Sequence, residues 1–321
     1  MILGLIFSVS AFSQEGFMQL ASDSWPPFTS DYGGKAYSTE LVSEALKRID
    51  YSDETTYINF ESVIPGIQDG MFDGSAALWR TEEREEFILF SDPYLQNKLL
   101  LVGQKGADVS ATSLSELSEK RIGVVGTYAY GEEVDYATEV VFISGRSDQE
   151  NLEKLLAGEL DYILIDELII QYELTYHSEE VEENLEVGEL PLFTKSLHFG
   201  LSKSYPNAEE IMKQFNNAIF EMISDGTYNE ILELNWITAD VDGDGIEEYI
   251  HGSGAAGVER PKSSYDILFE ESRKNPTSAS DRYYINGQMY NGWQSVPAEY
   301  RAPVNTDPNA GQHGFGLHFK F

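Results

Sequence analysis

The chain has 321 residues, more than one hydrophobic core usually serves, so two or more domains are expected. Its 21 basic and 55 acidic residues give a formal net charge of −34, which makes nucleic acid and anionic membrane surfaces poor partners. The absence of cysteine excludes disulfides, thiol catalysis and thiolate metal sites. The charge is compatible with cationic solutes, and a salt-adapted surface explains it equally well.

The N-terminus has the features of a signal peptide. Residues 2–12 form an apolar run, and the small residues Ala11 and Ser13 have the spacing of a signal-peptidase site. The run is too short to remain in a bilayer as an anchor. A buried N-terminal strand is the alternative. We predict a signal peptide over residues 1–13 and a mature protein in the periplasm.

Strands and helices alternate over the next part of the chain. Apolar and β-branched runs predict strands at 17–21, 55–60, 72–78, 88–90 and 99–102. Between the first two strands, apolar residues at helical spacing predict a helix that is capped by Ser38 or Thr39. Short helices are expected over 64–68 and around Arg84.

A second unit follows with the same alternation. Strands are predicted at 122–125, 140–143 and 162–165, with helices after the second and third of them. A returning strand at 198–201 and helices over 208–224 and 227–236 complete the pattern. Such alternation indicates parallel sheets and an α/β fold. The chain is expected to cross between the two units near 102–104 and 193–195.

Short motifs in this region resemble those of the bacterial solute-binding protein family 3, the amino-acid type of periplasmic binding proteins. The resemblance covers residues 17–236, and its pieces are Trp25-Pro26-Pro27-Phe28, Gln68-Asp69-Gly70, Thr81-Glu82-Glu83-Arg84 with Ser91-Asp92-Pro93-Tyr94, Gly126-Thr127, the segment 156–161, and Asp225-Gly226-Thr227-Tyr228. It implies a two-lobed clamp of the second periplasmic-binding type with two interlobe crossovers. Lobe 1 would comprise 17–102 and 195–236, and lobe 2 would comprise 103–194.

The resemblance also implies a ligand site between the lobes. Arg84 would clamp a ligand carboxylate, for which its planar fork of donors is suited, and Asp166 would accept a ligand ammonium group. Trp25 and Phe28 flank two prolines and can present flat rings, and Gly126-Thr127 can offer donors to an anion. Three alternatives remain open: Arg84 as a surface residue, Trp25 and Phe28 as lobe-core aromatics, and Asp166 as a helix N-cap.

Two stretches depart from the family pattern. Leu78-Trp79-Arg80 stands just before the arginine helix, where the family has small or hydroxyl residues, and Ala36-Tyr37-Ser38 replaces the usual Gly-Phe-Asp before the first helix. Tyr128 and Tyr130 add further bulk. These rings predict a stacked or ring-bearing ligand rather than an ordinary α-amino acid.

The C-terminal part begins with an acidic loop and linker over 237–262. Asp240, Asp242, Asp244 and Glu248 space oxygens at positions 1, 3, 5 and 9 around Gly245, which suits Ca²⁺, while an acidic turn is the alternative. Position 12 of a helix–loop–helix calcium site would need glutamate and is His251. Residues 263–321 form an extension of unknown role, expected to be small and irregular, with one amphipathic helix over 263–274.

We therefore expect a monomeric receptor that closes on a small carboxylate-bearing solute, amino-acid-like or ring-bearing. It would deliver this solute to a permease of an ABC transporter or report it to a membrane sensor, with no cofactor in the clamp. A dehydratase-like enzyme on the same fold is the second hypothesis, although no convincing acid/base pair is evident. An interaction module based on the calcium-type tail is the third.

Overall fold

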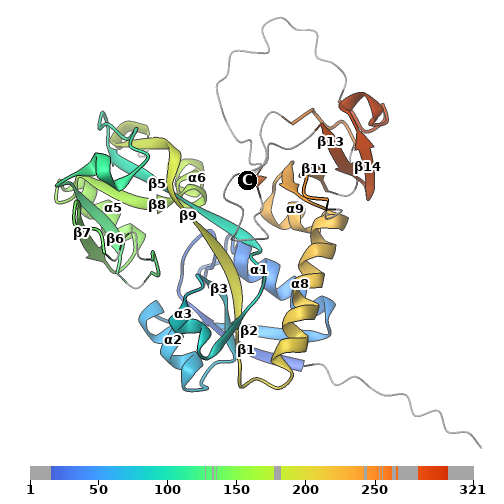
Figure 1. Cartoon of the computed structure of the whole chain (residues 1–321), viewed down its shortest axis with the longest axis horizontal. Helices are drawn as coiled ribbons and strands as arrows, with labels where there is room; N and C mark the ends of the chain where they lie inside the picture. The colour runs from blue at the N-terminus through green and yellow to red at the C-terminus, as the bar shows by residue number, and fades with distance from the viewer. Residues whose placement is uncertain are drawn as a thin grey trace, which may run out of the picture.

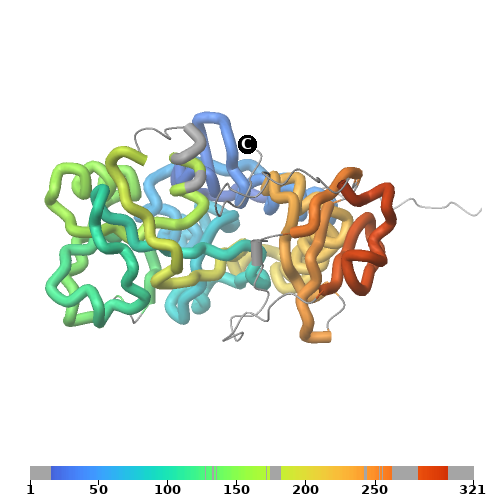
Figure 2. Tube along the Cα trace, turned by 90° about the horizontal axis from the view of Figure 1, so that it is seen from above, coloured from blue at the N-terminus to red at the C-terminus, as the bar shows by residue number. Residues whose placement is uncertain are grey.

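A computed structural model of the chain describes residues 16–302, except for 127, 132–133, 135, 177–181, 242–243, 253, 255, 262–264 and 267–280. The predicted signal peptide lies outside the described residues. Three parts follow one another along the long axis of the molecule: lobe 2, lobe 1 and the C-terminal extension (Figure 2).

Lobe 1 is built on parallel strands with helices around them (Figure 1). Its elements are β1 (Gly16–Ser22), α1 (Tyr37–Arg48), β2 (Tyr51–Tyr57), α2 (Phe60–Gln68), β3 (Gly74–Leu78), α3 (Glu82–Glu85), β4 (Ile88–Phe90), α8 (Ala208–Asp225) and α9 (Thr227–Leu232). β1 pairs in parallel with β2 along its full length, from Gly16–Tyr51 to Ser22–Tyr57. This register sets the bounds of β2, so the predicted strand over 55–60 was placed too late, and Phe60 begins a helix instead.

The beginning of α1 fixes the segment that carries Trp25 and Phe28. The helix starts at Tyr37 after Ala36, not at a Ser38 or Thr39 cap as predicted. The N–H groups of Tyr37 and Ser38 donate to the carbonyls of Pro27 and Phe28, at 2.8 and 2.9 Å. These carbonyls accept hydrogen bonds from the first N–H groups of the helix and so take the place of a side-chain cap. Tyr37 and Ser38 are both buried in the lobe.

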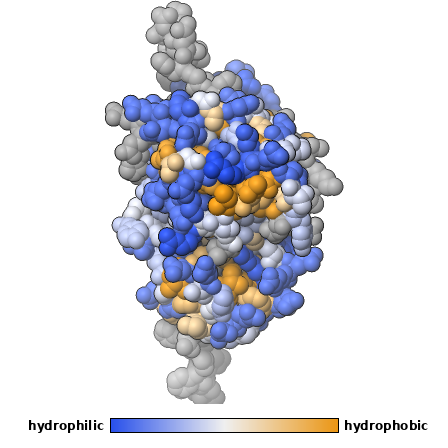
Figure 3. All heavy atoms as spheres, turned by 90° about the vertical axis from the view of Figure 1, so that its left-hand side faces the viewer, coloured by the Kyte–Doolittle hydropathy of each residue, from blue (hydrophilic) through white to orange (hydrophobic). Residues whose placement is uncertain are grey.

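Lobe 2 has a second parallel set of strands. It contains η1 (Leu114–Leu117), β6 (Arg121–Val125), β7 (Val141–Gly145), α5 (Asp148–Leu156), β8 (Tyr162–Asp166) and α6 (Glu167–Tyr176). β6 pairs in parallel with both β7 and β8, as the alternation of strands and helices predicted. Hydrophilic residues cover most of the lobe 2 face in Figure 3, with small apolar patches between them.

Two long antiparallel strands, β5 (Leu95–Gln104) and β9 (Leu185–Ser202), connect the lobes. The end of β9 pairs with β3 and β4 in lobe 1, while Leu99–Gly103 of β5 pairs with β8 in lobe 2. The first crossing therefore lies before Leu99, earlier than the predicted 102–104, because the apolar run at the end of β5 is a core strand of lobe 2. Residues 95–98 and 194–197 form the two-stranded hinge.

The C-terminal extension is ordered where it is described, which corrects the expectation of irregular structure. A five-stranded sheet contains β10 (Ile237–Ala239), β11 (Glu248–His251), β12 (Tyr265–Asp266), β13 (Arg282–Ile285) and β14 (Gln288–Asn291), followed by η2 (Trp293–Ser295). The predicted helix over 263–274 is wrong at Tyr265–Asp266, which pair with β10. The sheet rests against lobe 1, where the Asn229 side-chain amide donates to the carbonyl of Ile250. Among the described residues, the helices fall short of the length and apolarity that a membrane span needs.

Candidate ligand-binding site

Arg84 is a buried cation at the edge of lobe 1. The Thr81 hydroxyl accepts from the backbone N–H of Arg84 at 3.2 Å and so caps α3. The guanidinium Nη1 donates to the Trp79 carbonyl at 2.7 Å, and its carbon lies 5.6 Å from the centroid of the Phe60 ring. The residue is only 9% exposed, so the alternative of a surface arginine is wrong. No carboxylate among the described residues forms an ion pair with it, and burial lowers its pKa.

Aromatic rings from both lobes meet beside this arginine. Trp25 and Trp79 of lobe 1 lie 5.4 and 5.3 Å from the ring of Tyr128 in lobe 2, measured between centroids. Trp79 also lies 5.4 Å from Tyr130. The ring planes are inclined to one another by 58–72° in these three pairs. We call Trp25, Trp79, Tyr128 and Tyr130 the interlobe aromatic cluster.

The two aromatic residues of the Trp25-Pro26-Pro27-Phe28 segment have different surroundings. Phe28 is fully buried and packs on Trp25 at 4.3 Å, so it is a lobe-core residue. Trp25 faces lobe 2, where its Nε1 donates to Asp148 Oδ2 at 3.1 Å. Phe60, at the start of α2, lies 5.8 Å from Tyr128 and was not identified from the sequence.

Two acidic residues that the sequence did not identify lie near this contact. Asp148 is the first residue of α5, and burial raises its pKa to about 7, while the bond from Trp25 acts in the opposite direction and the charge of Asp23 adds to the rise. Burial also raises the pKa of Asp23 to about 6. The only sequence signal for Asp148 was the capping box Ser147–Glu150, which marks a helix start, and the ends of strands and starts of helices line ligand sites in α/β folds.

Asp166 is 1% exposed at the end of β8. Its Oδ1 accepts from the backbone N–H of Leu168 at 2.7 Å, so the N-cap alternative is confirmed. Its Oδ2 accepts from Asn97 Nδ2 at 3.1 Å. Burial raises its pKa to about 7, and these hydrogen bonds oppose the rise. A capping role does not exclude a ligand contact, because a carboxylate has about four acceptor sites and Asp166 uses three of them, for Leu168, Asn97 and the backbone of Lys98.

The structure describes only one of the two residues of the predicted Gly126-Thr127 anion site. The Gly126 N–H donates to the Gly145 carbonyl at 3.0 Å, so it is already bonded within lobe 2. Thr127 lies outside the described residues, and its contribution to an anion pocket stays a prediction.

Two carboxylates of the acidic loop pair with an arginine from β13, which the spacing of oxygens could not reveal. Asp242 lies outside the described residues. Asp240 accepts from the backbone N–H groups of Asp244 and Gly245, while Arg282 Nη1 lies 2.7 Å from Asp244 Oδ2 and 3.0 Å from Glu248 Oε1. Within the described part of the chain, no three His, Asp or Glu side chains are grouped to hold a metal ion.

The fold defines a two-lobed clamp, with a buried arginine and the carboxyl groups of Asp148 and Asp166 near the junction of its lobes. The chain belongs to the bacterial extracellular solute-binding proteins, family 3, whose model matches residues 19–238. The histidine-binding periplasmic protein of Salmonella typhimurium (strain LT2) is 27% identical, over 61% of this chain and 76% of that protein.

Two solved structures are also similar. An ancestral arginine-binding protein bound to arginine is 26% identical, covers 68% of this chain and 97% of its own, and has a TM-score of 0.57. An ancestral amino acid-binding protein that is a precursor of cyclohexadienyl dehydratase is 20% identical, covers 68% and 94%, and has a TM-score of 0.56, so it supports the fold alone.

Proposed function

We propose that this protein is a periplasmic receptor that closes on a small, positively charged, carboxylate-bearing solute and presents it to an ABC transporter or a membrane sensor. The observation that carries the proposal is Arg84, a buried guanidinium with no carboxylate partner among the described residues. An unpaired buried charge is unfavourable, so a ligand carboxylate is a chemically sensible partner for it.

The preference for a cationic ligand rests on the carboxylates around the cleft. Asp23, Asp148 and Asp166 all have raised pKa values because burial disfavours their charged forms. A ligand ammonium or guanidinium group would compensate this loss of solvation. Histidine and arginine, which appear in the names of the similar proteins, combine such a group with a carboxylate.

The aromatic cluster favours a flat or ring-bearing ligand. Trp25 and Trp79 on one lobe and Tyr128 on the other contact one another directly in this structure, and once the lobes separate their faces become free to stack on a planar cation. Closure would then follow from contacts that a ligand makes with both lobes at once, which shifts the equilibrium towards the closed form. The bond from Trp25 Nε1 to Asp148 crosses the same gap and would add to the closed form.

The proposal is tested by finding the ligand and then removing its clamp. Native mass spectrometry of freshly purified protein should detect a carried-over solute, and calorimetry with basic and ring-bearing amino acids should find a dissociation constant in the micromolar range. Arg84→Ala should weaken binding about tenfold to a hundredfold, as expected for a charged hydrogen bond worth about 1.5–3 kcal/mol.

Arg80→Ala is the matched control, because Arg80 is an exposed arginine four residues earlier that pairs with Glu85. Its affinity should equal that of the unmutated protein. Normal binding by Arg84→Ala would refute the assignment of the site.

A dehydratase-like activity is the second candidate. The observation in its favour is that Asp148 and Asp166 both have pKa values of about 7, near which a carboxyl group can exchange protons at neutral pH. We propose that the protein is not an enzyme, and turnover of a prephenate-like acid that is lost in Asp148→Asn or Asp166→Asn would overturn this.

Three further properties belong to the proposal. We propose that residues 1–13 direct export, that the receptor is a monomer, and that the acidic loop takes up Ca²⁺ through Asp240, Asp242, Asp244 and Glu248. Sequencing the N-terminus of the exported protein and measuring its mass in solution test the first two. A rise in melting temperature with CaCl₂ that EGTA reverses would support the third, and an unchanged melting temperature would refute it.

A further inference from the structure

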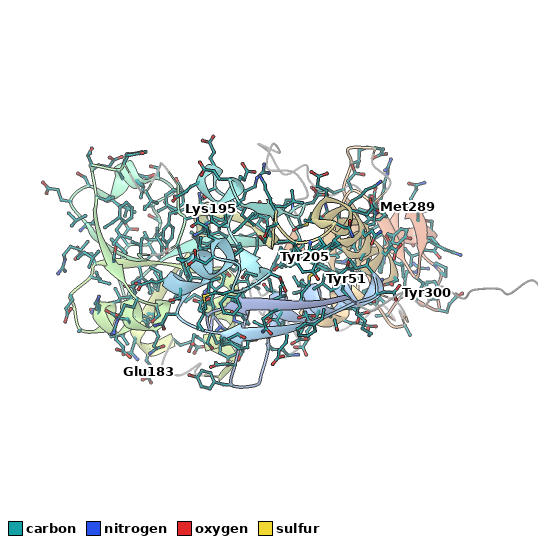
Figure 4. The ribbon with its side chains drawn as sticks, turned by 90° about the horizontal axis from the view of Figure 1, so that it is seen from below. Tyr51, Glu183, Lys195, Tyr205, Met289 and Tyr300 are labelled. Atoms are coloured by element: carbon teal, nitrogen blue, oxygen red, sulfur yellow. The ribbon has the colours of Figure 1, made fainter. Side chains whose placement is uncertain are left out.

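Asn97 lies in the two-stranded hinge and has no exposed surface. Its partner in the register of β5 and β9 is Lys195, which Figure 4 labels on the strand between the lobes. Asn97 is therefore placed where the chain passes from one lobe to the other, and its side chain meets residues of both.

The hydrogen bonds of Asn97 fix the orientation of its amide group. Trp79 Nε1 lies 2.7 Å from Asn97 Oδ1, and an indole N–H can only donate, so the atom it meets must be the amide oxygen. The amide nitrogen consequently faces Asp166, with Nδ2 at 3.1 Å from Oδ2. All three side chains are buried, with exposed fractions of 5, 0 and 1% for Trp79, Asn97 and Asp166.

We propose that Asn97 is a positioning residue that couples the relative orientation of the lobes to the orientation of the Asp166 carboxylate. Trp79 follows β3 in lobe 1, Asp166 ends β8 in lobe 2, and Asn97 bonds to both from the hinge. The amide is short, so its two bonds coexist only while Trp79 and Asp166 keep their present separation. Opening of the lobes breaks one bond and removes a hydrogen bond from either the Trp79 indole N–H or the Asp166 Oδ2, which favours the closed form.

The coupling rests on the proposed function in one respect only, the role of Asp166 as a ligand acceptor. If Asp166 holds a ligand cation, Asn97 orients the acceptor, and its loss weakens binding through the lobe equilibrium and not through a direct contact. The effect on the lobes themselves is independent of any ligand, and so the first measurement uses none.

Trp79→Phe and Asn97→Asp each disturb one of the two hydrogen bonds of Asn97. Trp79→Phe keeps a ring and removes the N–H donor. Asn97→Asp keeps the size and the oxygen that faces Trp79 but sets a second carboxylate oxygen against Asp166. Asn97→Leu removes both bonds. Gln104→Leu is the matched control, because Gln104 lies at the end of the same strand and its amide donates to the Leu155 carbonyl within lobe 2.

The chain has no cysteine, so a pair of dyes can be attached specifically to Asp69→Cys on lobe 1 and Glu159→Cys on lobe 2, both exposed positions. Single-molecule energy transfer on the full-length protein without ligand should show a shift towards open molecules in Asn97→Leu, Asn97→Asp and Trp79→Phe, but not in Gln104→Leu. In combination, Asn97→Leu and Trp79→Phe should be non-additive, because they remove the same bond.

Energy-transfer distributions that match the unmutated protein in all three variants would overturn the coupling, whatever the ligand proves to be. If Asn97→Leu does not fold, Trp79→Phe and Asn97→Asp decide the question by the same measurement. Retained binding in Arg84→Ala would refute the proposed function without altering the energy-transfer result, so the two failures are distinguishable.

Discussion

Arg84 at the edge of lobe 1 and Arg282 in the C-terminal extension place the same guanidinium group in opposite settings. Arg282 spans Asp244 and the fully buried Glu248, and its hydrogen bonds to these carboxylates raise its pKa. Arg84 is buried and bonds to a backbone carbonyl, and burial lowers its pKa although the charge of Glu83 acts in the opposite direction. The difference indicates that Arg282 belongs to the structure of the extension, and it agrees with our proposal that Arg84 binds a ligand carboxylate.

This comparison leads to opposite predictions for removing each charge, and the largest effect is expected at Arg84. Arg84→Met keeps an unbranched apolar chain and removes the buried charge, so ligand affinity should fall about tenfold to a hundredfold, as for the loss of a charged hydrogen bond. The melting temperature should stay the same or rise, because the desolvation of the charge is relieved. Calorimetry and thermal unfolding measure the two effects. A lower melting temperature with unchanged affinity would reverse the assignment.

Arg282→Met should do the reverse. It leaves the buried Glu248 carboxylate without its cation, so the melting temperature of the extension should fall by several degrees. The affinity for the ligand should stay the same, because the extension contacts the far end of lobe 1. Thermal unfolding followed by tryptophan fluorescence is suitable, since Trp236 and Trp293 both pack in the hydrophobic cluster of the extension. Arg260→Met is the control, because the pair of Arg260 with Asp281 is exposed on both sides.

The contrast between the two arginines also shows what the sequence could and could not predict. The motif around Arg84 is local, so the strand, the turn and the Thr81 cap could be expected from neighbouring residues. The bond between Arg282 and Asp244 joins residues 38 positions apart in a sheet whose β12 was predicted to be helical. For the same reason Asp148, Phe60 and Asn97 were not identified, because only the closing of one lobe on the other brings them to the site.

The pH dependence of stability tests the buried carboxylates of the cleft. Above about pH 4 the unfolded chain has released the protons of these carboxyl groups, whereas the folded protein still holds them because their pKa values are raised to about 7. The free energy of unfolding should therefore decrease as the pH rises from about 5 to 7 and then level off. Asp148→Asn and Asp166→Asn should each reduce this decrease. Between pH 5 and 7 each such group should cost about 2–3 kcal/mol of stability, at about 1.4 kcal/mol per pH unit, so the melting temperature should fall by several degrees per carboxyl group.

The matched control for this experiment is a carboxylate with the opposite shift. Arg121 and its hydrogen bonds hold the pKa of Asp161 at about 2, so Asp161 stabilises the fold above about pH 4 and should not contribute between pH 5 and 8. Asp161→Asn should lower the melting temperature by a similar amount at both pH values. If Asp148→Asn and Asp166→Asn behave in the same way, the cleft carboxylates are ionised throughout this range, and their raised pKa values are wrong.

The smallest predicted effect concerns the single hydrogen bond from Trp25 to Asp148. Trp25→Phe keeps most of the ring contact with Tyr128 and removes the Nε1 donor, so Asp148 loses the bond that opposes the rise of its pKa. Affinity for a cationic ligand should therefore change by less than about tenfold, since the bond contributes about 1 kcal/mol and the carboxylate stays available. The loss should be larger at pH 6 than at pH 8, because more of Asp148 is then protonated. A loss that does not depend on pH would mean that Trp25 acts through its ring alone, and Asp148 would then have no part in holding the ligand.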